Sequence, residues 1–173
     1  MINPDRRNFD QEYITKELGR LNGVLNEKLS IYLLGGAVMT IEGLKPGTKD
    51  IDVIVEEERD HRILVSSLEK CEYYLLQPQD LSGPYNELSA TAMQNLEGFR
   101  WEIFVEYVAK KMALTDTIRL RASKIFSGGK LTVFRLSNED MFLMKGMTES
   151  YWSIHPGSGQ NLMCRERNSG ILS

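Results

Sequence analysis

The chain contains the segment Leu33-Leu34-Gly35-Gly36-Ala37-Val38-Met39-Thr40, which is followed after a loop by Thr48-Lys49-Asp50-Ile51-Asp52-Val53. The apolar residues before Gly35 predict a buried strand, and the residues after Gly36 predict a helix. Two glycines at this junction allow a ligand to approach the backbone, because no Cβ stands in the way. The free N–H groups at the start of the helix then favour a phosphate group at the same place.

Two acidic residues lie close together in the second predicted strand. Asp50 and Asp52 are two positions apart, so their side chains project from one face of the strand. Two carboxylates ~4 Å apart repel each other by ~4 kcal/mol at an effective dielectric constant of ~20. Protonation of one carboxylate, or a hard cation between the two, relieves this repulsion. Oxygen ligands with open positions suit Mg²⁺ that carries a triphosphate.

A third acidic residue is expected beside this pair. The segment 99–108 is rich in aromatic and β-branched residues and gives the strongest strand signal in the chain. We expect it to lie beside the strand that carries the aspartates, with Glu102 and Glu106 on one of its faces. Glu102 is the candidate third ligand and Glu106 the fallback. Three carboxylates facing a glycine turn predict a two-cation site for phosphoryl or nucleotidyl transfer.

The rest of the chain alternates between helical and extended patterns. An N-cap is expected at Ser137, with a helix after it and an acidic residue at the third helical position. This alternation predicts an α/β (α+β) domain with a mixed twisted sheet flanked by helices. The patterns predict helices over 9–28, 37–42, 57–70, 85–96 and 115–124, strands over 31–34, 51–55, 71–76, 99–108 and 131–136, and a loop over 77–84.

The length and the net charge of the chain exclude some classes of protein. The chain has 173 residues, with 21 Lys and Arg against 24 Asp and Glu, so its net charge is −3. An acidic chain lacks the positive field that sequence-independent binding of duplex DNA needs. Its apolar stretches are shorter than the ~20 residues of a membrane span, and residues 1–7 lack the apolar core of a signal peptide. We expect one domain over 1–149, an irregular tail over 150–173, and a cytoplasmic location.

These motifs resemble the signature of the DNA polymerase β-type nucleotidyltransferase superfamily. The match lies in Gly35-Gly36 followed by Thr48-Lys49-Asp50-Ile51-Asp52-Val53. The chain is most similar to the small prokaryotic minimal nucleotidyltransferases, some of which act as toxins or antitoxins. The resemblance runs from about residue 10 to residue 149. It also includes Trp101 to Val105, Arg121-Ala122 and Glu139 to Lys145.

The resemblance implies a nucleotidyltransferase fold that binds an NTP. Its glycine turn, Gly35 and Gly36, and the helix after it would hold the nucleotide phosphates. Thr48, Lys49 and Lys145 are further candidates for contacts with the nucleotide, with an exposed surface lysine as the alternative for each of the two lysines. The acceptor hydroxyl would belong to a protein, an RNA end or a small molecule. A homodimer, or a cognate toxin or antitoxin, is the partner that the resemblance implies.

The resemblance also implies a metal site. Asp50 and Asp52 would bind Mg²⁺ or Mn²⁺, and Glu102 would be the third ligand and the base that activates the acceptor hydroxyl. Related chains usually carry Asp where this one has Glu102, and a misplacement of ~1 Å can cost ~100-fold in rate. Related chains also often continue with charged helix, whereas residues 150–159 match no known pattern.

The sequence therefore allows two other interpretations besides an enzyme. One is a non-catalytic binding module with the same fold, for example one component of a toxin–antitoxin pair. The other is a plain structural α/β domain, which predicts that nucleotides have no effect on the protein.

Overall fold

The computed structural model describes residues 6–77, 90–108 and 112–144. The helices are α1 Gln11–Val24, α2 Gly36–Ile41, α3 Glu58–Lys70 and α4 Asp116–Arg121. The main-sheet strands are β1 Leu29–Leu34, β2 Asp50–Val55, β3 Tyr74–Leu75, β4 Thr91–Gln94, β5 Arg100–Val105, β8 Ser123–Ser127 and β9 Leu131–Arg135. β6 Tyr107–Val108 and β7 Met112–Ala113 form a separate small sheet.

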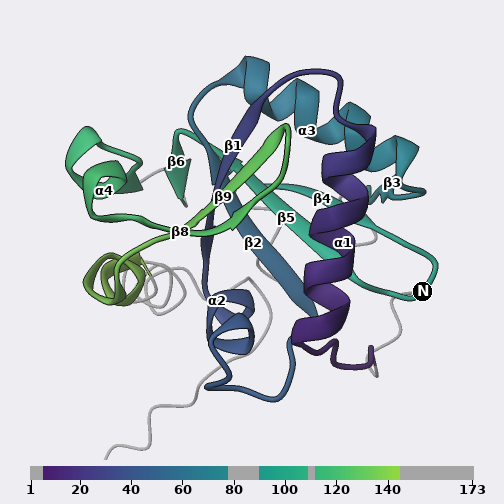
Figure 1. Ribbon diagram of the computed structural model, residues 1–173, viewed down its shortest axis with the longest axis horizontal. Coiled ribbons are helices and arrows are strands. Elements are labelled where there is room, and N and C mark those ends of the chain that lie inside the picture. Colours follow the sequence, from purple (N-terminus) through teal and green to yellow (C-terminus); the bar gives the residue numbers. More distant parts are fainter. Residues whose placement is uncertain (1–5, 78–89, 109–111, 145–173) are drawn as a thin grey trace, which may run out of the picture.

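The main sheet has seven strands in the order β3-β4-β5-β2-β1-β9-β8 (Figure 1). β2 lies between β1, which is antiparallel to it, and β5, which is parallel to it. The expected strand at 99–108 is therefore present beside the strand with the aspartates. The register pairs Asp52 with Glu102 on one side and with Leu34 on the other. The mixed α/β fold with helices flanking a sheet is confirmed.

The two faces of the sheet pack against different elements. On one face, Val53, Trp101 and Ile103 lie in a core that also contains Ile14 of α1 and Leu64 of α3. These side chains are 1% exposed or less. Because strand residues alternate between faces, Asp50, Asp52 and Glu102 project from the opposite face.

A second apolar cluster covers the other end of that opposite face. It contains Tyr32, Ile54 and Phe104 of the sheet, together with Ile118 of α4 and Met144. Residues 138–144 are helical, and the backbone N–H of Asp140 donates to Ser137 Oγ at 3.1 Å. The predicted N-cap at Ser137 is thus confirmed. This cluster leaves the carboxylates at the edge of a packed layer, beside the glycine turn.

The helix predicted over 85–96 is wrong in the part that the structure describes. β4 runs over Thr91–Gln94 and pairs antiparallel with β5. Its Met93 is fully buried and lies opposite Trp101. Pairing with a long central strand and burial of one face outweigh the weak helical pattern here.

The helix predicted over 115–124 is also too long. α4 ends at Arg121, and β8 begins at Ser123 and pairs antiparallel with β9. Gly128 and Gly129 join these two strands, which is a common way to close a hairpin. The strand predicted over 71–76 is reduced to Tyr74–Leu75.

Glu106 does not share a strand face with Glu102. β5 ends at Val105, and Glu106 has a φ of +59° and an exposed side chain. The left-handed backbone at Glu106 breaks the long predicted strand into β5 and β6, so the fallback ligand is withdrawn. Most of the predicted 77–84 loop, Lys145 and the tail over 150–173 lie outside the described residues. No helix in the described parts is long and apolar enough to cross a membrane.

Candidate functional site

The glycine turn between β1 and α2 lies directly against the carboxylate strand. Gly35 has a φ of +70°, and a Cβ built on it would stand 2.7 Å from Asp52 Oδ2. A Cβ on Gly36 would stand 2.9 Å from Thr48 Oγ1. Both positions therefore exclude a side chain, Gly35 by backbone conformation as well as by space. The turn keeps the backbone of the β1–α2 junction in contact with Asp52.

Replacing Gly35 with alanine is expected to destabilise the fold. The new Cβ would press on Asp52 in a backbone conformation that L-residues avoid, at a cost of about 1–3 kcal/mol. Urea unfolding monitored by circular dichroism measures this change. Gly19→Ala is the matched control, because Gly19 lies exposed in α1 and a Cβ there meets no atom within 4 Å. That control should gain about 0.5–1 kcal/mol, and equal effects at the two sites would contradict the close approach.

Asp52 and Glu102 form the centre of the site. They lie opposite each other on adjacent parallel strands, and a hydrogen bond joins their carboxyl groups. Glu102 is only 3% exposed, and its Oε1 accepts no hydrogen bond from the described residues. The nearest cation is the buried guanidinium of Arg100, with Nη1 3.9 Å from that oxygen. A buried carboxyl oxygen without a hydrogen-bond donor is costly unless a ligand satisfies it.

Both carboxyl groups of this pair have raised pKa values. Burial and the neighbouring carboxylates raise the pKa of Asp52 to about 7 and the pKa of Glu102 to about 9. The hydrogen bond between them lowers the pKa of Asp52 and raises that of Glu102. The pair titrates as a unit. A group with such a shifted pKa in a polar site is a candidate for chemistry or for cation binding.

Asp50 has a different environment. Its Oδ2 lies 3.4 Å from Nη2 of Arg6, and its side chain is 25% exposed. Neither Arg6 nor Arg100 was expected at the site from the sequence. Arg100 has a usable signal, since it is two residues before Glu102 and hence on the same face of its strand. Arg6 has none, because no periodicity links it to a strand that begins at residue 50.

The carboxylate oxygens at this site suit a cation that also binds phosphate oxygens of a ligand. They do not suit a cation that is enclosed by protein ligands alone. Among the residues that the structure describes, no three His, Cys, Asp or Glu side chains converge closely enough to hold a metal ion. Mg²⁺ commonly takes one or two carboxylates and completes its shell with phosphate oxygens and water. The joined carboxyl groups of Asp52 and Glu102, the unpartnered Oε1 and the glycine turn that lies against Asp52 suit that mode. Asp50 would be a further ligand.

The loop before β2 places the other predicted nucleotide contacts. Thr48 is 2% exposed, and its hydroxyl donates to the carbonyl of Asp50 at 3.1 Å, so it fixes the loop to the strand. Lys49 is partly exposed beside it. Lys45, which the sequence did not single out, carries its Nζ next to Gly36, 3.5 Å from the position of a Cβ there. The role of Lys145 stays a prediction, as do the nucleotide contacts of Thr48 and Lys49.

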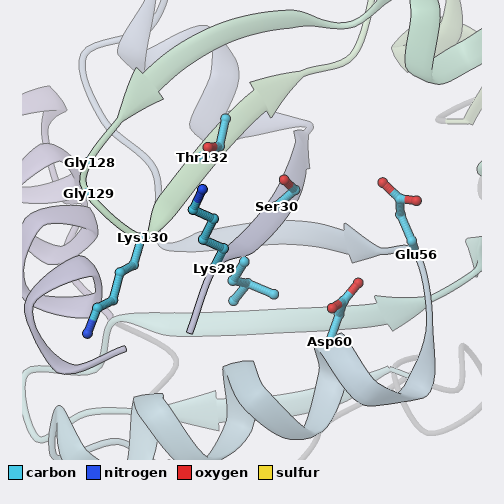
Figure 2. A pocket seen from close by; sticks show the side chains of 9 residues that line it. Lys28, Ser30, Glu56, Asp60, Gly128, Gly129, Lys130 and Thr132 are labelled. Atoms are coloured by element: carbon cyan, nitrogen blue, oxygen red, sulfur yellow. The ribbon is translucent and has the colours of Figure 1, made fainter. Parts of the chain in front are cut away.

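A hollow of about 410 Å³ lies elsewhere, at the beginning of β1 (Figure 2). Lys28, Ser30, Glu56 and Asp60 line it, but no predicted site residue does. Its Glu56 already accepts from Tyr32 and Arg119, at 2.8 and 2.6 Å. Because Gly35 follows the other end of β1, this hollow is separate from the carboxylates.

A solved structure resembles this arrangement of strands and helices. It is the crystal structure of a "putative nucleotidyltransferase" from Thermotoga maritima, with a TM-score of 0.56 and 14% sequence identity. The match covers 88% of this chain and 96% of that one. The chain has a nucleotidyltransferase-like fold. No family model matches the sequence, and no curated protein matches it either.

The similarity to the Thermotoga maritima structure is one of fold. At 14% identity, it does not transfer a substrate or a reaction from one chain to the other. Any function therefore has to be argued from Asp50, Asp52, Glu102 and the glycine turn of this chain.

Proposed function

We propose that this protein is a divalent-cation-dependent nucleotidyltransferase, which moves a nucleoside monophosphate from an NTP to a hydroxyl acceptor. The observation that supports this most is the Asp52–Glu102 pair, with its unpartnered carboxyl oxygen, beside a glycine turn that excludes a Cβ. The fold, which is similar to that of a structure named as a nucleotidyltransferase, is consistent with it. Mg²⁺ or Mn²⁺ would be held by Asp52 and Glu102 together with phosphate oxygens of the NTP, and Asp50 would be a further ligand.

Each group has a defined task in this reaction. A bound divalent cation would supply charge neutralisation at the transferring phosphate. Gly35 and Gly36 let the backbone of the turn lie against Asp52 and Thr48, and Lys45 and Lys49 add positive charge on the loop before β2. Glu102, once deprotonated, accepts the proton of the attacking hydroxyl. The acceptor oxygen forms a bond to the α-phosphorus, the bond from that phosphorus to the bridging oxygen breaks, and pyrophosphate leaves.

A non-catalytic nucleotide-binding module is the second candidate. The observation that favours it is the state of Glu102, which is buried, protonated at neutral pH and close to the guanidinium of Arg100. A carboxyl group that is already protonated cannot accept a proton. The protein would then act through a partner, for example the other component of a toxin–antitoxin pair.

The first test is thermal unfolding of the full chain with ATP, GTP, CTP or UTP, each with and without Mg²⁺. A nucleotide at 100 times its Kd adds about 2.7 kcal/mol of stability, which raises the Tm by roughly 5–10 °C for a chain of this length. The enzyme predicts a Mg²⁺-dependent shift that is lost in Asp50→Asn. It also predicts transfer of α-³²P label from that NTP to an acceptor in a pool of cellular RNA and protein.

The two candidates and the structural domain give different results. A shift without label transfer favours the binding module. The absence of a shift with all four nucleotides contradicts nucleotide binding, and it leaves a module that binds a protein partner or the structural α/β domain.

A further inference from the structure

The side chain of Arg6 reaches the carboxylate site from outside the sheet. It precedes α1 in the chain, yet its guanidinium lies at the start of both site strands. Nη1 donates to the carbonyl of Lys49 at 3.1 Å and to the carbonyl of Gly98 at 3.3 Å. Nη2 donates to Asp50 Oδ2 at 3.4 Å. Since Lys49 directly precedes β2 and Gly98 lies just before β5, one guanidinium ties together the beginnings of two parallel strands.

The backbone near Arg6 is anchored at the same place. Phe9 and Thr48 exchange two backbone hydrogen bonds, of 2.8 and 2.9 Å. Gly47 packs against this segment so closely that a Cβ there would stand 3.0 Å from the carbonyl oxygen of Phe9. The Arg6 side chain is 15% exposed. This segment, residues 6–9, is therefore part of the wall of the site and carries Arg6 to a fixed position.

We infer that Arg6 is a positioning residue, which orients the Asp50 carboxylate for the divalent cation of the proposed function, on which this inference rests. The contact is made to Oδ2 of Asp50, whose side chain is 25% exposed. Hydrogen bonds to a ligating carboxylate fix its orientation, and their loss typically costs 10–100-fold in metal affinity. The two carbonyl contacts hold the guanidinium in place whether or not a cation is bound.

Arginine suits this role better than lysine. Its planar guanidinium presents donors in several fixed directions and reaches three acceptors on Lys49, Gly98 and Asp50 together. A lysine at this position would keep the charge but would lose the fixed spacing between these donors. Arg6→Lys therefore separates geometry from charge, and Arg6→Gln removes the charge as well.

The alternative is that Arg6 weakens the binding of a divalent cation. A positive charge beside Asp50 also repels a divalent cation, so an Arg6 that acted only as an internal competitor would weaken metal binding. The two roles differ in sign. Removal of a positioning residue lowers metal affinity, whereas removal of a competitor raises it.

The test is titration of the full chain with Mn²⁺ alone, followed by electron paramagnetic resonance of the free ion. Wild type, Arg6→Lys, Arg6→Gln and Arg7→Gln are compared, and urea unfolding confirms that each is folded. Arg7 is the matched control, because it is the next residue along and is exposed, with its guanidinium paired to Glu97. We expect Mn²⁺ affinity to fall by about 10–100-fold in both Arg6 variants and to stay unchanged in Arg7→Gln.

Each other result overturns a specific claim. Equal Mn²⁺ affinity in wild type and the Arg6 variants overturns the positioning role and leaves the proposed function standing. Tighter binding in the Arg6 variants overturns it in favour of competition. A wild-type chain that binds no Mn²⁺ at millimolar concentration, alone or with a nucleotide, overturns the proposed function and this inference together.

Discussion

Replacing Asp52 with asparagine is expected to lower kcat/KM for nucleotidyl transfer by about 1,000-fold or more. Asparagine keeps the shape of the side chain but removes the charge at the centre of the site, next to Gly35 and Glu102. Stabilisation of the transferring phosphate by a bound cation is worth several kcal/mol, and each ~1.4 kcal/mol is a factor of ten in rate. The measurement is single-turnover transfer of α-³²P label from the NTP that gives the largest thermal shift.

The same variant is expected to be more stable than wild type when no cation is present. The raised pKa of Asp52 means that its ionised form is disfavoured in the folded state. A neutral amide at this position removes the free-energy cost of burying that charge. A loss of activity with a gain in stability cannot come from unfolding. Asp60→Asn is the control, since burial raises the pKa of Asp60 as well but it lines the separate hollow. Transfer by Asp52→Asn within tenfold of wild type would contradict a catalytic role for this carboxylate.

The strands that carry the candidate site could be predicted from the sequence because their signals are local. A short apolar run that ends in Gly35-Gly36, and alternation through Asp50 and Asp52, define two neighbouring strands without any knowledge of the rest of the chain. The strong β pattern of 99–108 led us to expect this strand beside the one with the aspartates, and the pairing of β5 with β2 confirms that neighbour. The metal and nucleotide roles of these residues stay predictions.

Elements whose structure depends on partners far along the chain could not be predicted. Thr91–Gln94 becomes a strand because it pairs with β5, and Ser123–Ser127 because it pairs with β9. Neither segment has a strong pattern of its own, so tertiary pairing decides its conformation. The position of the Arg6 side chain could not be predicted for the same reason. Its contacts are to residues 43 and 92 positions away, and no spacing rule spans such separations.

The sequence also did not predict the charge state of the site. The Glu102 carboxyl was expected to be a metal ligand and a base, which requires an ionised side chain. The structure places it next to Asp52 in a buried position, where the pair retains a proton at neutral pH. This protonation follows from burial and register together, and both are properties of the folded sheet.

Raising the pH from about 4 to about 9 without divalent cations is expected to lower the free energy of unfolding by at least about 4 kcal/mol, the contribution of Asp52 alone. The pKa values of Asp52 and Glu102 are raised in the folded state, so the folded protein binds more protons than the unfolded chain. Stability from this pair is therefore complete below about pH 4 and is lost as the pH rises through about 7 to 9. A shift from 3.8 to about 7 at Asp52 alone corresponds to this magnitude.

Other groups with shifted pKa values do not reverse this trend. The pKa of Asp140 is lowered by its hydrogen bond from Arg121, and its contribution to stability is lost only as the pH falls through acid values. Burial lowers the pKa of His61, so this single group opposes the trend of the two carboxyl groups. Urea unfolding at a series of pH values measures the net slope, and Asp52→Asn should flatten it. A wild-type profile that is level between pH 5 and pH 9 would contradict the buried acid pair.

The binding of a divalent cation should be linked to the protonation of Asp52 and Glu102. The cation binds the ionised forms of Asp52 and Glu102, so its binding releases protons and its affinity rises with pH. Saturating Mn²⁺ should therefore raise the free energy of unfolding most at about pH 9, where the unliganded pair is most costly, and least at about pH 5. The cation offsets the repulsion that the fold creates between these two side chains. If added Mn²⁺ stabilises the protein equally at both pH values, the carboxyl pair is not its binding site.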